Sequence, residues 1–150
     1  MGNRMSELTY ELIGKEEILT KVKAQLLGVR EKVLVTMEAD EEKIHPTPKE
    51  YFDCFLTTMR NGKTGIRLGF GKRGLYENEL RDKVYLPDSL SYTFVPTDST
   101  DYRRMLLFDD SRLICRKFDA RTPHVWYSED PKWIADYKKY FEDHLSSKSR

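Results

Sequence analysis

Three polar side chains between residues 102 and 109 have types and spacing that would suit an anion site: Tyr102, Arg104 and Asp109. Arg104 fits that role best, because a guanidinium grips phosphate or carboxylate through two parallel hydrogen bonds. Tyr102 is a weak nucleophile near neutral pH, since an unperturbed phenol has a pKa of about 10. Structural roles are open as well. Arg104 could pair with Asp101 or Asp109 at the surface, Asp109 suits a turn, and Tyr102 suits a strand.

A glycine-rich stretch offers a second set of candidate ligand residues. Gly69 to Gly74 matches the GxGxxG spacing of dinucleotide-binding turns and directly follows an expected strand. The glycines are not followed by a long apolar helix, and the expected strand is not the first one, so the context of a cofactor site is missing. We interpret Lys72 and Arg73 as part of a basic turn near a ligand pocket, and we expect no cofactor.

Aromatic and histidine side chains give weaker indications. Trp126 on an expected strand and Trp133 on the last expected helix could line a pocket, although large aromatics at such positions usually belong to the core. His45, His124 and His144 lie far apart, and none has a second metal-type residue at helix or hairpin spacing. The sequence therefore supports Trp126 as a candidate ligand contact and supports no metal site.

Length and composition are those of one folded domain. The chain has 150 residues, 39% of them hydrophobic, which is enough for one core over residues 1–150, with about six N-terminal and about five C-terminal residues flexible. A net charge of +1 gives no overall field toward DNA or an anionic membrane. No apolar stretch is long enough to span a membrane, and we expect a cytoplasmic protein with no membrane partner. Cys54 and Cys115 lie in apolar stretches, so we expect buried thiols.

The first half of the chain predicts an alternation of helices and strands that would position these residues. Helical spacing of apolar residues runs from Lys15 to Val29, and a β-branched run follows at Val33 to Met37. A second helix opens at Thr47 and Pro48 and stops at Asn61 and Gly62. A strand at 64–70 then completes a parallel βαβ unit.

The second half predicts antiparallel strands and a closing helix. Residues 71–88 read least clearly, with one short helix around 76–81, and a strand follows at about 90–95. Two strands at 104–108 and 112–116 flank the turn residues 109–111 and predict a hairpin. A further strand covers 124–127, and Ser128 to Pro131 opens the final helix.

The spacing of Tyr102, Arg104 and Asp109 resembles the His-x-Lys-x-x-x-x-Asp signature of the phospholipase D superfamily, with only the aspartate retained. Residues 110–115, residues 126–131 and the aromatic last helix look like the end of the phospholipase D-like domain in archaeal TrmB-type transcriptional regulators. The opening helix and the strand at 33–35 are similar to the start of such domains. The resemblance implies an α/β fold with a mixed sheet flanked by helices, half of a phospholipase D-like fold.

The replaced positions are those that the resemblance makes catalytic. In the active family one histidine attacks phosphorus, another protonates the leaving group, and the lysines hold the phosphate oxygens. We therefore expect a non-catalytic ligand-sensing and dimerising domain of a transcriptional regulator. Its expected partners are a second copy of the chain and a small anionic or sugar ligand, with DNA contacted only through a separate domain. The alternatives are a divergent nuclease or phosphodiesterase with another residue set, and a protein-interaction module.

Overall fold

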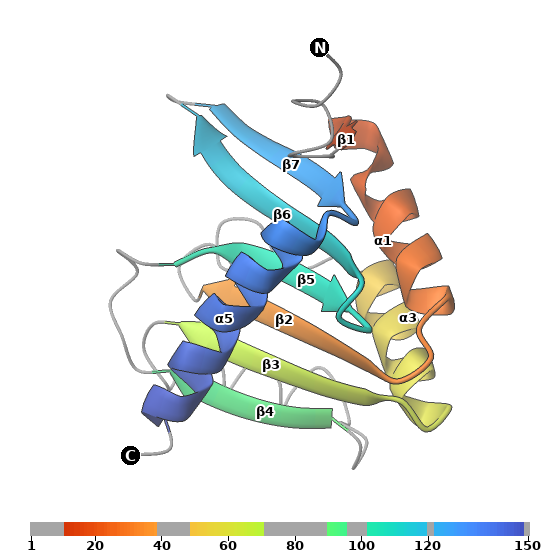
Figure 1. Cartoon of the computed structure of the whole chain (residues 1–150). Helices are drawn as coiled ribbons and strands as arrows, with labels where there is room; N and C mark the ends of the chain where they lie inside the picture. Colours follow the sequence, from red (N-terminus) through yellow and green to blue (C-terminus); the bar gives the residue numbers. More distant parts are fainter. Residues whose placement is uncertain (1–10, 39–48, 71–89, 96–101, 120–121, 149–150) are drawn as a thin grey trace.

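A seven-stranded mixed sheet forms the centre of the molecule, with strand order β1-β7-β6-β5-β2-β3-β4 (Figure 1). The computed structural model describes residues 11–38, 49–70, 90–95, 102–119 and 122–148. The strands are β1 (Glu11–Ile13), β2 (Lys32–Glu38), β3 (Thr64–Phe70), β4 (Leu90–Val95), β5 (Arg104–Phe108), β6 (Arg112–Asp119) and β7 (Thr122–Ser128). The helices are the short 3-10 helix η2 (Lys15–Glu17), α1 (Ile18–Leu27), α3 (Lys49–Arg60) and α5 (Pro131–Lys148).

The strands β2, β3 and β4 form the parallel part of the sheet. β2 pairs with β3 from Lys32↔Thr64 to Glu38↔Phe70, and α3 lies between them in sequence. The helix α3 ends before Gly62, whose φ of +89° is a left-handed conformation that glycine adopts without strain. The predicted parallel βαβ unit is thus confirmed.

The remaining strands are antiparallel. β5 runs antiparallel to β2, β6 to β5, β7 to β6 and β1 to β7. The predicted hairpin is confirmed, with Phe108 opposite Arg112 around a turn in which Asp109 and Asp110 have φ near +57°. The sequence did not predict β1, because a strand of three residues is too short to show a recognisable alternation of apolar and polar side chains.

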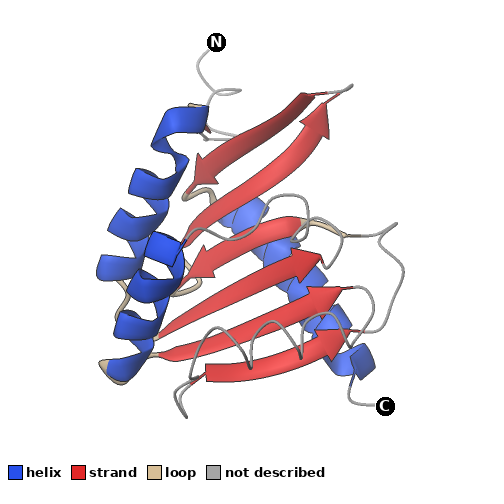
Figure 2. Cartoon of the chain, turned by 180° about the vertical axis from the view of Figure 1, so that it is seen from behind, coloured by secondary structure: helices blue, strands red, loops and turns tan. Residues whose placement is uncertain are grey.

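Helices cover both faces of the sheet. α1 and α3 lie on one face and α5 crosses the other, as the two opposite views show (Figures 1 and 2). Because successive strand residues point to opposite faces, Leu106 and Phe108 of β5 pack with α1 and α3, whereas Met105 and Leu107 pack with α5. The α/β fold with a mixed sheet flanked by helices is therefore confirmed.

The final helix begins as its sequence predicts. Asp130 Oδ1 accepts the N–H of Lys132 at 2.8 Å, Ser128 Oγ accepts the N–H of Asp130 at 3.0 Å, and Pro131 is the first helical residue. No helix in the described ranges is long and apolar enough to cross a membrane.

Some details differ from the sequence-based expectations. The helix expected from Lys15 starts there as a 3-10 turn, and the α-helix proper begins at Ile18. Cys115 is buried, but Cys54 is only half-buried. The expected short helix at 76–81 lies outside the described residues.

Candidate functional site

Tyr102 and Arg104 lie where the parallel strands end. β5 starts at Arg104 and runs antiparallel to β2, so its start lies next to the carboxyl end of β2. The carboxyl ends of parallel strands are the usual place for ligands in open α/β sheets. Tyr102 and Arg104 therefore lie at the edge of the sheet where ligands usually bind.

The side chain of Tyr102 is packed into the structure. Its ring meets Phe70 edge to face, with 5.5 Å between the ring centroids. Burial raises the pKa of the Tyr102 hydroxyl, although the charge of Arg104 and a hydrogen bond to it act in the opposite direction. At neutral pH the phenol is protonated, which is the state in which it is a poor nucleophile.

Arg104 is held by the end of β2. Its Nη1 donates to the backbone carbonyl of Thr36 at 2.6 Å and contacts Sδ of Met37. Of the two aspartates expected as surface partners of Arg104, Asp109 lies at the other end of β5, and Asp101 lies outside the described residues. The contacts with Thr36 and Met37 place the guanidinium beside the sheet, on the side of α1 and α3.

Arg116 lines the same part of the structure and was not among the residues predicted from the sequence. It pairs directly with Arg104 across the β5–β6 ladder, so the two side chains point to the same face. Burial lowers the pKa of Arg116, and the carboxylate of Glu38 at the end of β2 acts against that shift. The charges of two arginines and of Glu38 thus influence one another at this end of the sheet.

The two arginines line a cavity of about 330 Å³ between α1, α3 and the sheet. We call it the Arg104–Arg116 cavity. The rest of its lining is mostly aliphatic and consists of Ile18, Leu19, Val22, Leu106, Ile114 and Val125, together with Tyr51 and Cys115. The volume lies at the lower end of the range for small-molecule sites. A largely apolar cavity whose lining includes two arginine side chains has the composition of a ligand pocket.

The side chain of the neighbouring Arg103 points to the opposite face of the sheet and contacts α5. Its guanidinium lies 4.7 Å from the ring centroid of Tyr140, and its Nη1 is 3.2 Å from Oδ2 of Asp136. Its backbone N–H donates to the Tyr140 hydroxyl at 2.8 Å. Arg103 and Arg104 therefore serve opposite faces of the sheet.

Asp109 does not join Tyr102 and Arg104. It lies at the far end of β5, roughly 17 Å from Arg104 at the usual rise per strand residue. Its carboxylate accepts the backbone N–H groups of Arg30, Glu31 and Lys32 at 2.8, 2.8 and 3.0 Å. Arg112 adds an ion pair at 3.3 Å. The expected turn role is therefore observed, and the carboxylate is occupied by the α1–β2 connection rather than turned toward the cavity.

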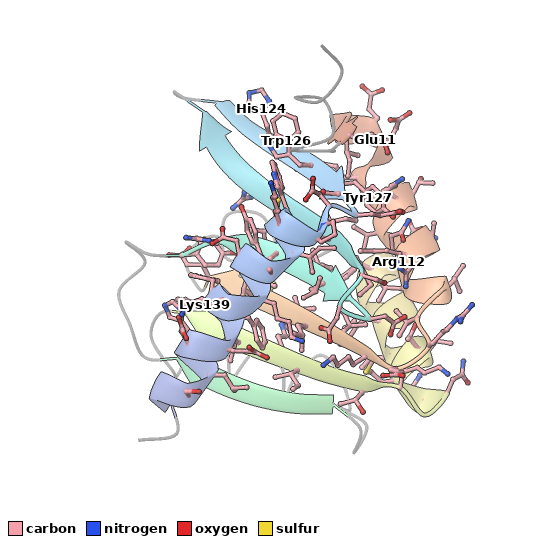
Figure 3. All side chains as sticks on the ribbon, viewed as in Figure 1. Glu11, Arg112, His124, Trp126, Tyr127 and Lys139 are labelled. Carbon is pink, nitrogen blue, oxygen red and sulfur yellow. The ribbon has the colours of Figure 1, made fainter. Side chains whose placement is uncertain are left out.

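Trp126 also lies apart from the cavity. It is half-buried on the α5 face, with its ring 6.4 Å from that of Trp133 and 6.1 Å from that of His124. Figure 3 shows Trp126 and His124 side by side on β7. The next residue back, Val125, is the one that lines the cavity on the opposite face. Lys72 and Arg73, the remaining predicted ligand residues, lie outside the described residues.

Comparison of the structure with solved structures identifies the fold. NucT from Helicobacter pylori superposes with a TM-score of 0.63 over 93% of this chain and 95% of that one, at 13% identity. Nuc from Salmonella typhimurium, a phospholipase D family member, gives a TM-score of 0.66 over 93% and 95% at 10% identity. The chain has a phospholipase D-like fold. Neither a protein-family model nor a curated protein matches the sequence.

The archaeal chromatin protein TrmBL2, described as showing a novel mode of DNA binding, is similar too. Its TM-score is 0.64 at 13% identity, over 92% of this chain and 52% of that one. This chain thus spans about half the length of TrmBL2. The phospholipase D-like fold and the TrmB-like neighbour agree with the resemblance found in the sequence.

Proposed function

We propose that this chain is a non-catalytic phospholipase D-like domain that binds a ligand and pairs with a second copy, as the sensing part of a regulator. The observation that carries the proposal is the state of the two replaced signature positions. Tyr102 is protonated and packed on Phe70, and its hydroxyl is bonded to Arg104. A protonated phenol is a weak nucleophile and a guanidinium keeps its protons, so this pair does not reproduce the histidine and lysine of the signature.

The sensing part of the proposal is supported by the Arg104–Arg116 cavity. A cavity of about 330 Å³ is large enough for a small ligand, and its arginines favour an anion. The similarity to about half of TrmBL2, an archaeal chromatin protein with a novel mode of DNA binding, supports a role in association with DNA. With a net charge of +1, the chain has no strong attraction to nucleic acid of its own, so contact with DNA belongs to a separate domain in this proposal.

The test combines an activity assay with a size measurement. We expect no hydrolysis of bis(p-nitrophenyl) phosphate, single-stranded DNA or duplex DNA, with or without magnesium. Light scattering after size exclusion should give twice the chain mass of 17.8 kDa. Turnover that Tyr102→Phe abolishes would make the tyrosine catalytic and overturn the proposal, and a monomer at all concentrations would remove its pairing part.

A further inference from the structure

The Arg104–Arg116 pair is an electrostatic arrangement that an anion would relieve. The two residues are direct partners in an antiparallel ladder, where like charges are unfavourable. Burial also disfavours the charged form of Arg116. The charge of Glu38, at the end of β2, favours the charged form of Arg116 and acts against this effect.

The geometry of the guanidinium groups suits a planar or tetrahedral anion. Each guanidinium carries five N–H donors in a fixed fork and can hold several acceptors at once, as Arg104 does with the Thr36 carbonyl and the Tyr102 hydroxyl. Arg116 stands on the adjacent strand at the same level of the sheet. An oxyanion that lies over the two strands on this face of the sheet would therefore meet donors from both guanidinium groups.

The rest of the cavity suits an aliphatic body. Val22, Leu106 and Ile114 belong to the buried core of the α1 and α3 side, and Ile18, Leu19 and Val125 pack against it. All six line the cavity together with the arginines. Burying a hydrocarbon chain there is favourable, although Tyr51 and Cys115 also line the cavity and add a hydroxyl and a thiol.

We propose that the Arg104–Arg116 cavity binds a single-chain amphipathic anion, with its carboxylate or phosphate head at the two arginines and its hydrocarbon chain between α1 and the sheet. This inference rests on the proposed ligand-binding function and names its ligand class. Among the two expected ligand classes it selects the anion over the sugar. The aspartate of the signature and Trp126 take no part in it.

Calorimetric titration of the full chain with a matched set of probes tests the proposal. Hexanoate, octanoate and decanoate vary the chain, decanol removes the charge, acetate removes the chain, and decyl phosphate exchanges the head group. We expect affinity to rise roughly fourfold with each added methylene until the cavity is full. Decanol and acetate should bind at least tenfold more weakly than decanoate. The order of decanoate and decyl phosphate identifies the head group.

Variants locate the site. Arg104→Gln and Arg116→Gln should each weaken decanoate binding at least tenfold, and Leu19→Trp, which fills the cavity from α1, should abolish it. Arg103→Gln is the matched control, because that arginine serves the other face. Circular dichroism and thermal melting check that each variant folds. Since Arg104 also holds the end of β2, Arg116→Gln keeps the test valid if Arg104→Gln unfolds.

The outcomes separate this inference from the proposed function. Equal binding of decanol and decanoate, equal loss in Arg103→Gln, or no binding of either amphipathic anion would overturn the inference. None of these results depends on hydrolysis or on the size of the assembly. Phosphodiesterase turnover or a monomer would count against the proposed function while leaving the titration result unchanged.

Discussion

Asp109 and Lys32 hydrogen-bond to each other in both directions. The backbone N–H of Asp109 donates to the Lys32 carbonyl at 2.9 Å, and Oδ1 of Asp109 accepts the N–H of Lys32 at 3.0 Å. The same carboxylate accepts the N–H groups of Arg30 and Glu31. Asp109 thus attaches the β5–β6 turn to the connection between α1 and β2, which gives this aspartate a structural role.

Asp109→Asn should destabilise the fold by about 3 kcal/mol, because an amide replaces a charged acceptor of three backbone hydrogen bonds. Asparagine tolerates the positive φ of this position, so the backbone is not strained by the change. Urea unfolding at pH 7 measures the effect. Asp143→Asn, which removes an exposed carboxylate paired with Lys139, should leave the unfolding free energy nearly unchanged. Equal effects of the two substitutions would contradict this role for Asp109.

The stabilising effect of Asp109 should depend on pH. Burial opposes its ionisation, but the backbone N–H groups of Arg30, Lys32 and Glu31 and the charge of Arg112 together lower its pKa below the usual value. A carboxyl group with a lowered pKa stabilises the fold above its unfolded pKa, and this contribution is lost as the pH falls through the folded pKa. The difference in unfolding free energy between the wild type and Asp109→Asn should therefore be constant from pH 7 to about pH 5 and shrink below about pH 4. A difference that does not change over this range would show that ionisation is not involved.

Thr36→Val should be costly despite its nearly unchanged volume. The fully buried hydroxyl of Thr36 donates to the Arg103 carbonyl at 2.5 Å and accepts the N–H of Met105 at 3.0 Å. It thereby bridges β2 and the start of β5, beyond the last paired residues of that ladder. Valine would leave the Arg103 carbonyl and the Met105 N–H without this partner, so the free energy of unfolding in urea should fall by about 3 kcal/mol. Thr57→Val, on the exposed side of α3, is the control and should cost under about 0.5 kcal/mol. A small loss at Thr36 would mean that the strands hold together without this bridge.

Most of the fold was predictable because local signals agreed with it. The parallel pairing of β2 and β3 followed from a helix between two strands, and the β5–β6 hairpin followed from apolar runs on either side of a turn. The position of Arg116 in the cavity lining could also have been predicted. In a hairpin whose turn covers residues 109–111, counting outward from Phe108 and Arg112 places Arg104 opposite Arg116. That count would have identified Arg116 as a site residue.

Other parts of the site depend on contacts that no local pattern records. The side chain of Asp109 meets residues almost eighty positions earlier, and the signature spacing alone grouped it with Arg104 although the strand separates them. Trp126 lies on the α5 face because of the register between β7 and β6. That register could not be predicted from the sequence. The contacts of Arg103 could not be predicted either, because its partners lie on α5, far away in the sequence.

Tyr140→Phe tests how α5 is attached to the segment that carries the replaced signature. The nearly buried hydroxyl of Tyr140 accepts the Arg103 N–H at 2.8 Å, while its ring stacks with Phe70 and contacts the Arg103 guanidinium. Removing the hydroxyl leaves the ring contacts in place and deprives one N–H of its acceptor, so we expect a loss of about 1.5 kcal/mol in urea unfolding. Hydrogen exchange by NMR should show faster exchange at the Arg103 amide than in the wild type.

The matched control for this variant is Tyr127→Phe. That hydroxyl bonds Glu129 at the surface, where a hydrogen bond contributes little, and the unfolding free energy should change by less than about 0.5 kcal/mol. Exchange at the Arg103 amide should stay as in the wild type in this control. If Tyr140→Phe left both the stability and the exchange rate unchanged, the hydroxyl would not anchor the segment. The ring contacts of Arg103 would then be the attachment, and Arg103→Ala should destabilise the fold more than Tyr140→Phe because it removes the cation over the Tyr140 ring.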